Sequence, residues 1–188
     1  MASLDHAAVD ALLDRARREV DAGLLPACQL ALGLDGKVVV NEAFGEADRD
    51  TRFTIFSATK PFVASVVWQL IGEGLVEPSR RVLDYLPSFG DNGKEDITVE
   101  QVMLHTSGFP HAPLGPGRWE THESRAQTMA GWRCNWEPGT KFEYHPTSAH
   151  WVLAEIIYAV TGEDHTVAVR RRVAEPLGLT QFALGLAE

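Results

Sequence analysis

The sequence is poor in cysteine and has no excess of positive charge. Its 188 residues contain 2 cysteines, and 17 Lys and Arg stand against 26 Asp and Glu, which gives a formal net charge of −9. Nucleic acids and anionic membrane surfaces are bound through clustered cations, so this balance argues against both as partners. Two cysteines can form at most one bridge, and we expect Cys28 and Cys134 to be buried free thiols in a reducing compartment.

Long hydrophobic runs are also lacking. The longest, such as residues 62–68, fall well short of the ~18 apolar residues that a transmembrane helix needs. The first residues mix acids with arginines, where a signal peptide needs a basic start and an uninterrupted apolar stretch. We therefore predict a cytoplasmic protein without a membrane partner. The hydrophobic content of 45% is typical of a globular domain with one real core.

Hydrophobic periodicity predicts that the N-terminal part mixes helix and strand. Apolar residues at helical spacing predict an amphipathic helix over residues 3–22. Two alternating runs around Asp35-Gly36 predict a β-hairpin over residues 27–44. After a loop, residues 53–56 are expected to re-enter the core, and a helix rich in apolar residues is expected over 61–71.

The rest of the chain is expected to be mainly helical, because short apolar stretches alternate with glycine and proline. The expected helices are 82–86, 99–105, 147–160 and 167–173. Residues 108–117 hold three prolines and three glycines and are predicted to form a loop. Two strands do not make an independently stable sheet, so we expect the hairpin to need strands from outside these residues.

A serine and a lysine stand three residues apart in Ser57-Ala58-Thr59-Lys60, at the entrance of the expected helix over 61–71. This spacing places both side chains on one face of a helical turn. A serine nucleophile needs a neighbouring base, and it needs N–H groups that stabilise negative charge, which the first turn of a helix provides. Lys60 can be that base only when its amine is uncharged. The pair alone is a weak signal, because a helix start with a solvated lysine has the same pattern.

A tyrosine is a second candidate for proton transfer. Tyr144 is one of three tyrosines and follows a turn at residues 137–140, just before the helix expected over 147–160. A phenol close to a lysine can have its pKa lowered and can then accept the proton of a serine. The alternative is a half-buried tyrosine that makes a single hydrogen bond, which is commoner for a lone tyrosine.

Four segments in this order resemble the class C β-lactamase-like serine hydrolases, relatives of the penicillin-binding proteins. The segments are Ser57-Ala58-Thr59-Lys60, residues 97–108 (ITVEQVMLHTSG), Glu137-Pro138-Gly139-Thr140 with Tyr144, and Glu175-Pro176-Leu177-Gly178-Leu179. They cover essentially the whole chain and are far more specific than the serine and lysine alone. The resemblance implies an α+β fold, in which an antiparallel sheet flanked by helices lies beside a mainly helical subdomain, with the active site between them.

The resemblance also implies roles for individual residues. Ser57 would be the acylated nucleophile, Lys60 and Tyr144 would share the proton transfer, and the backbone N–H of Ser57 would form half of an oxyanion hole. No cofactor is implied.

The chain departs from the family pattern after its tyrosine. The family has a small residue and then asparagine, whereas His145 and Pro146 follow Tyr144 here, so the amide is absent. His145 is a candidate to replace it in the substrate pocket. His111 and Trp119 are further pocket candidates, although the density of tryptophans in this region favours packing.

A second departure concerns the family's third motif, Lys or His followed by any residue and glycine, on a strand near the C-terminus. The sequence has no credible copy, in agreement with the missing strands, and we expect a C-terminal segment or a second chain to complete the sheet. We interpret residues 1–188 as one partial catalytic domain. Residues 1–60 would form the N-terminal helix and hairpin, and residues 61–188 the nucleophile helix and the mainly helical part.

The leading hypothesis is a serine hydrolase that cleaves a carboxylic ester or amide through an acyl-enzyme on Ser57. The predicted cytoplasmic location favours an esterase-like activity. One alternative is an amidase of the β-lactamase or D-alanyl peptidase type. Another is a non-catalytic or incomplete relative that acts as a binding or assembly module. A metal is not indicated, because residues 122–126 lack the second histidine of the zinc-binding helix motif.

Overall fold

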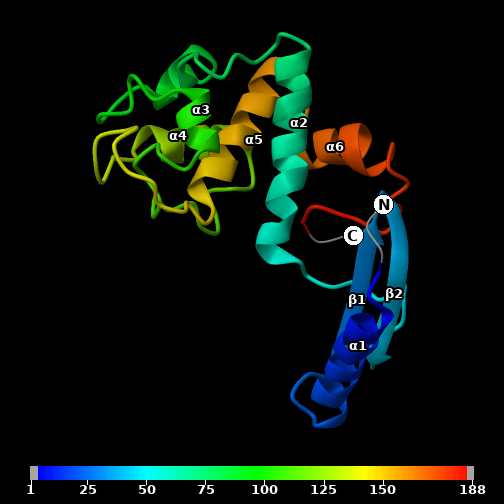
Figure 1. Ribbon diagram of the computed structural model, residues 1–188. Coiled ribbons are helices and arrows are strands. Elements are labelled where there is room, and N and C mark those ends of the chain that lie inside the picture. The colour runs from blue at the N-terminus through cyan, green and yellow to red at the C-terminus, as the bar shows by residue number, and fades with distance from the viewer. Residues whose placement is uncertain (1–3, 186–188) are drawn as a thin grey trace. The chain divides into compact units, whose positions relative to one another are not determined.

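The computed structural model describes residues 4–185. These divide into two compact units, Met1–Thr54 and Ile55–Glu188 (Figure 1). The boundary lies six residues before the one expected from the sequence, so Ser57 and Lys60 both belong to the second unit. Among the described residues, no helix has the length and apolar character needed to cross a membrane.

The first unit is a helix with a β-hairpin. The helix α1 (His6–Asp21) begins at Asp5, whose side chain accepts a hydrogen bond from the Ala8 amide. The strands β1 (Ala27–Leu34) and β2 (Lys37–Gly45) pair antiparallel, with a register shift between Leu32 and Gly33. These elements confirm the predicted helix and hairpin.

The turn of the hairpin has the geometry that its sequence predicts. Asp35 and Gly36 have φ values of 48° and 75°. Two successive positive φ values are those of the tight turn that follows the twist of a hairpin. The sheet of the described residues contains these two strands.

The prediction that residues 53–56 re-enter the core is wrong. The side chains of Phe53, Ile55 and Phe56 are 44%, 41% and 80% exposed. Residues 53–56 form neither a strand nor a buried helix. They connect the two units, and their side chains are therefore exposed. The two cysteines also differ from expectation, since Cys28 and Cys134 are free but half-buried.

The second unit is helical within the described residues. The first 3-10 turn η1 (Phe56–Thr59) runs directly into α2 (Lys60–Gly72). The elements that follow are η2 (Val82–Asp84), η3 (Pro87–Phe89), α3 (Val99–Met103), α4 (His122–Ala130), α5 (Ser148–Thr161), α6 (His165–Val169) and η4 (Arg170–Ala174). The sequence did not predict α4, because two of its nine residues, Arg125 and Met129, are buried and its apolar pattern is weak.

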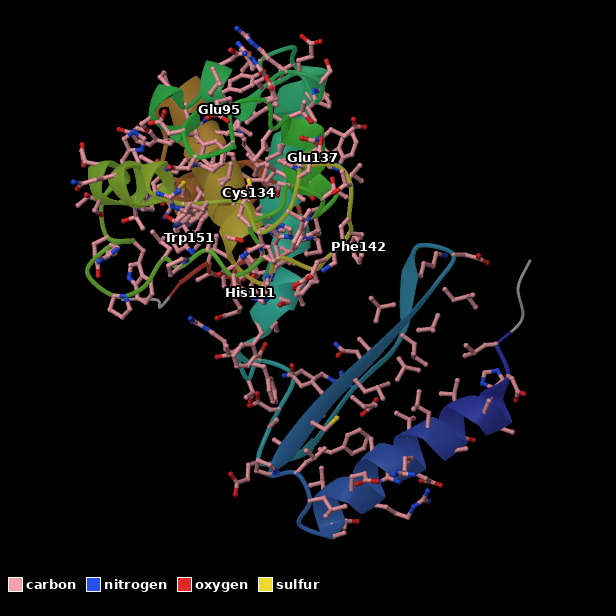
Figure 2. All side chains as sticks on the ribbon, turned by 90° about the vertical axis from the view of Figure 1, so that its left-hand side faces the viewer. Glu95, His111, Cys134, Glu137, Phe142 and Trp151 are labelled. Carbon is pink, nitrogen blue, oxygen red and sulfur yellow. The ribbon has the colours of Figure 1, made fainter. Side chains whose placement is uncertain are left out.

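The core of the second unit lies between α2 and α5, which run side by side (Figure 1). Val66 and Leu70 of α2 and Val152 and Ile156 of α5 are fully buried. Figure 2 shows how densely the side chains of this unit fill the space between its helices. Burial of each such side chain contributes about 1.5–3 kcal/mol, so this helix pair gives α2 a fixed position. The residues at the start of α2 are thereby fixed as well.

Candidate active site

Ser57 lies in the single 3-10 turn that precedes α2. The residue before it, Phe56, has a φ of 44°, a left-handed conformation that costs a non-glycine residue on the order of 1 kcal/mol or more. Such conformations gather at functional sites, because the surrounding structure must hold them in place. Ser57 is therefore presented at a constrained turn, with its amide in the first turn of the helical segment, where N–H groups lack helical acceptors.

Three predicted residues meet at one oxygen atom. Lys60 Nζ and Tyr144 Oη each donate a hydrogen bond to Ser57 Oγ, both at 2.9 Å. Lys60 Nζ also lies 5.2 Å from the centre of the Tyr144 ring. The serine and lysine come from consecutive turns, whereas the tyrosine comes from a segment 87 residues further along the chain. The structure thus places a hydroxyl, an amine and a phenol in mutual contact.

The electrostatics of this cluster make the phenol of Tyr144 easier to ionise than that of a free tyrosine. Hydrogen bonding with Lys60, and then with Ser57, holds the pKa of Tyr144 below its ordinary value of 10.0. A phenolate beside an ammonium group can accept a proton from a serine hydroxyl more readily than a free tyrosine can. The arrangement is that of a nucleophile with an adjacent base.

The segment that carries Tyr144 is fixed by His105. The carbonyl of His105 accepts a hydrogen bond from the Glu143 amide at 3.2 Å, and His105 Nδ1 accepts one from the His145 amide at 3.0 Å. The His105 and Tyr144 rings lie 5.1 Å apart. His105 itself has a φ of 58°. Sequence analysis did not single out this residue, although it stands inside the segment 97–108 that carries the resemblance.

His145 is a structural residue rather than a wall of the substrate pocket. It is fully buried, and its Nε2 accepts the Phe109 amide at 3.2 Å while its Nδ1 contacts the Glu143 carbonyl at 2.6 Å. The proton therefore lies on Nδ1, and Ser107 donates to Nε2 at 3.2 Å. Tyr144 contacts Ser57, whereas the side chain of its neighbour His145 is buried in the core.

The other two pocket candidates are placed differently from each other. His111 is 75% exposed, contacts Glu143 at 3.2 Å and lies at the surface of the second unit (Figure 2). A cavity beside Lys60 is the candidate substrate pocket. Trp119 lines this cavity, whereas His111 does not.

A cavity of about 500 Å³ opens beside Lys60. Its wall is mainly apolar and includes Val63, Trp119, Trp151 and Leu184. Ser57 and Tyr144 are not in its lining, but Lys60, which contacts Ser57, is. Ligand cavities commonly measure about 300–1,000 Å³, so this one is large enough for part of a small organic substrate.

His150 is a second residue of the site that sequence analysis did not select. It lines the cavity, and its Nδ1 is buried without a hydrogen-bond partner. Burial, with smaller contributions from Lys60 and His105, lowers the pKa of His150 to about 4. The imidazole is therefore neutral at physiological pH. The residues that the structure describes contain no cluster of acidic, histidine or cysteine side chains that could hold a metal ion.

The sequence model of the beta-lactamase family matches residues 12–188, and the chain belongs to this family. It is 34% identical over 169 residues to the Mycobacterium tuberculosis protein named Esterase/beta-lactamase LipL, a match that covers 83% of this chain and 38% of the relative. It is 27% identical over 192 residues to an Escherichia coli protein named Putative D-alanyl-D-alanine carboxypeptidase, covering 87% and 44%.

Solved structures confirm the fold class. A crystal structure of a family VIII carboxylesterase matches with a TM-score of 0.83 and 28% identity, covering 94% of this chain and 51% of that chain. A penicillin-binding protein homologue from Caulobacter crescentus matches with a TM-score of 0.75 and 28% identity, covering 90% and 48%. The fold is thus that of the serine β-lactamases and penicillin-binding proteins, and the chain spans about half the length of these relatives.

Proposed function

We propose that this chain carries the nucleophile and the proton-transfer residues of a serine hydrolase that acts on carboxylic esters. The observation that carries the proposal is the contact of Lys60 Nζ and Tyr144 Oη with Ser57 Oγ, each at 2.9 Å. Membership of the beta-lactamase family supports it, and the sequence segments that resemble that family include these three residues.

The proposed reaction has two half-reactions. Ser57 Oγ attacks the substrate carbonyl while its proton passes to the Tyr144 oxygen, and the ammonium group of Lys60 stabilises the phenolate before this transfer. The negative charge of the tetrahedral intermediate is stabilised by the Ser57 amide, in the first turn before α2. The proton then passes to the leaving alcohol, and water hydrolyses the acyl-enzyme by the reverse sequence. No cofactor takes part in these steps.

Esters are favoured over β-lactams and peptides by two observations. The solved structure that matches with a TM-score of 0.83 and 28% identity is named a family VIII carboxylesterase. In addition, Pro146 stands where the family has the asparagine that contacts substrate, and proline supplies neither a side-chain amide nor a backbone N–H. A substrate amide group therefore loses a polar partner at this position.

We further propose that the working site is completed by strands that add to the hairpin, from a further segment of the protein or a second chain. The two-stranded sheet of the described residues supports this, because a hairpin alone is marginally stable. The proposed substrates are small-molecule esters. The proposed location is the cytoplasm.

The experiment that tests the function is hydrolysis of 4-nitrophenyl butyrate by the wild type and by Ser57→Ala. The variant should lose turnover while its circular dichroism stays unchanged. Ser65→Ala is the matched control, because Ser65 lies on α2 and donates to the Pro61 carbonyl, away from the cluster. Undiminished turnover by Ser57→Ala would refute the assignment.

A further inference from the structure

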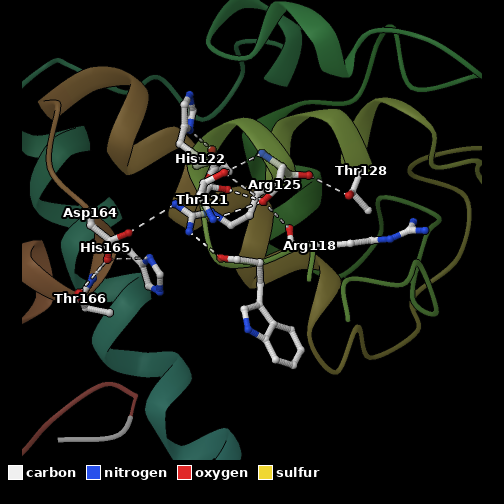
Figure 3. Close-up of polar contacts among 11 residues, drawn as sticks. Arg118, Thr121, His122, Arg125, Thr128, Asp164, His165 and Thr166 are labelled. Atoms are coloured by element: carbon white, nitrogen blue, oxygen red, sulfur yellow. Dashed lines mark hydrogen bonds and ion pairs between the residues drawn. The ribbon is translucent and has the colours of Figure 1, made fainter. Parts of the chain in front are cut away.

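Arg125, a buried arginine on α4, lies behind the wall of the cavity and pairs with a residue of α5. Arg125 is 5% exposed and its Nε pairs with Glu155, which is fully buried and pairs also with His122. Figure 3 shows the arginine among its polar partners. A buried guanidinium with a carboxylate partner is costly to desolvate, so its retention needs a reason beyond stability.

The three remaining contacts of Arg125 all reach the wall of the cavity. Its Nη1 donates to the Trp119 carbonyl at 2.8 Å, and its guanidinium carbon lies 5.8 Å from the centre of the Trp151 ring. Its Nη2 donates to Asp164 at 3.4 Å, and Asp164 lies 3.3 Å from Nδ1 of His165. One rigid, planar group thus contacts two residues that line the cavity, Trp119 and Trp151, and is linked to a third, His165, through Asp164, which lies behind the lining.

The wall that these contacts hold is uncharged. The ring of Trp151 packs edge-on against His165 at 5.5 Å, and burial lowers the pKa of His165, so its imidazole is neutral at physiological pH. The charge of Arg125 is balanced by Glu155 behind the wall. Among the described lining residues, Lys60 is the only lysine, arginine, aspartate or glutamate, and its amine already contacts Ser57.

Such a wall recognises a particular chemistry. A carboxylate bound there would lose its hydration without gaining a free cation, which is unfavourable, whereas an apolar group gains by leaving water. Indole rings add stacking and van der Waals contacts for flat or branched carbon groups. The cavity of about 500 Å³ has room for a group of several carbon atoms.

We propose that this cavity takes an uncharged, apolar part of the ester substrate, and that Arg125 is the positioning residue that sets its shape through Trp119, Trp151 and His165. The inference rests on the proposed ester hydrolysis and adds a substrate class to it. The occupant is either the acyl chain or the alcohol, and both have the same chemistry.

The test compares two matched pairs of substrates that differ by one carboxylate. The pair 4-nitrophenyl pentanoate and 4-nitrophenyl hemiglutarate varies the acyl side, and phenyl acetate and 4-carboxyphenyl acetate vary the alcohol side. After correction for spontaneous hydrolysis, kcat/KM should favour the neutral member by about tenfold or more in one pair, which identifies the occupied side. Equal values within both pairs, or a preference for the carboxylates, would overturn the inference while acetate turnover still supports the chemistry at Ser57.

Variants tie the preference to the wall. Trp119→Ala should reduce the preference for the neutral member about tenfold, through a higher KM for that member. Trp68→Ala is the matched control, because this indole is 61% exposed on α2, outside the cavity. An unchanged preference in Trp119→Ala would overturn the inference, and lack of turnover of every ester by the wild type would overturn the proposed function as well.

Arg125 is tested in a paired variant, Arg125→Met with Glu155→Gln, which leaves no unpartnered buried charge. A positioning role predicts that KM rises more for the neutral member of the preferred pair than for its carboxylate partner. A purely structural role predicts equal losses for all four substrates. That second result would overturn the positioning role of Arg125. Trp119 and Trp151 would then shape the wall without it.

Discussion

Replacing His150 with glutamine should make the second unit less sensitive to acid. Burial lowers the pKa of His150 from 6.5 to about 4 in the folded protein. The folded state therefore binds fewer protons than the unfolded state between these two values, so its stability is complete above the ordinary pKa and falls as the pH drops towards 4. The full loss is about 3 kcal/mol, and about 2 kcal/mol of it has occurred at about pH 5.

The assay is urea unfolding followed by tryptophan fluorescence at about pH 7.5 and about pH 5. All 5 tryptophans lie in the second unit, between residues 68 and 151, so the signal reports on the unit that holds His150. The wild type should lose about 2 kcal/mol more than His150→Gln between the two pH values. The difference between the variants is informative because other carboxylates and histidines contribute equally to both.

A matched control separates this effect from the general loss of an imidazole. His111 lies in the same unit but is 75% exposed, so His111→Gln should follow the wild type at both pH values. The reasoning is refuted if His150→Gln loses as much stability on acidification as the wild type, because burial would then not keep this imidazole neutral.

Three further outcomes are expected. Tyr144→Phe should lower kcat/KM by about 10²–10⁴-fold, because it removes the proposed base. The activity of the wild type should rise with pH to a plateau, and the midpoint of this rise should lie below 10, because the phenolate is the base. Glu155→Ala should destabilise the second unit by about 3–5 kcal/mol in urea unfolding, since Arg125 loses its buried carboxylate partner and keeps only the longer contact with the half-buried Asp164. Gly108→Ala should cost about 1–3 kcal/mol by the same measurement, because φ is 87° and the new Cβ would lie 2.7 Å from the Trp136 carbonyl oxygen.

Local sequence signals predicted local structure well. The turn at Asp35-Gly36 formed as expected, because its two positive φ values depend on those residues alone. Ser57 and Lys60 came together because three residues make one helical turn. Short-range spacing was therefore sufficient for two of the three residues in the candidate site.

The third residue needed the tertiary fold. Tyr144 reaches Ser57 across 87 residues of sequence. Its place after a turn made it a candidate, and the family resemblance assigned it to the same site as Ser57. His145 was expected in the pocket because it follows Tyr144, but its side chain is buried in the core, where contacts with Ser107 and Phe109 hold it. His150, Arg125 and the cavity wall have no local motif, because their roles arise from the packing of distant helices.

The most direct test of the central claim is an intact-mass spectrum of the folded protein before and after treatment with a fluorophosphonate probe, with the labelled peptide located by fragmentation. The account predicts a single adduct on Ser57 that is absent from Ser57→Ala and present in Ser65→Ala. Such a result would establish an activated serine at the position where Lys60 and Tyr144 meet. A folded protein that acquires no adduct, or acquires one on another serine such as Ser107, would contradict the account.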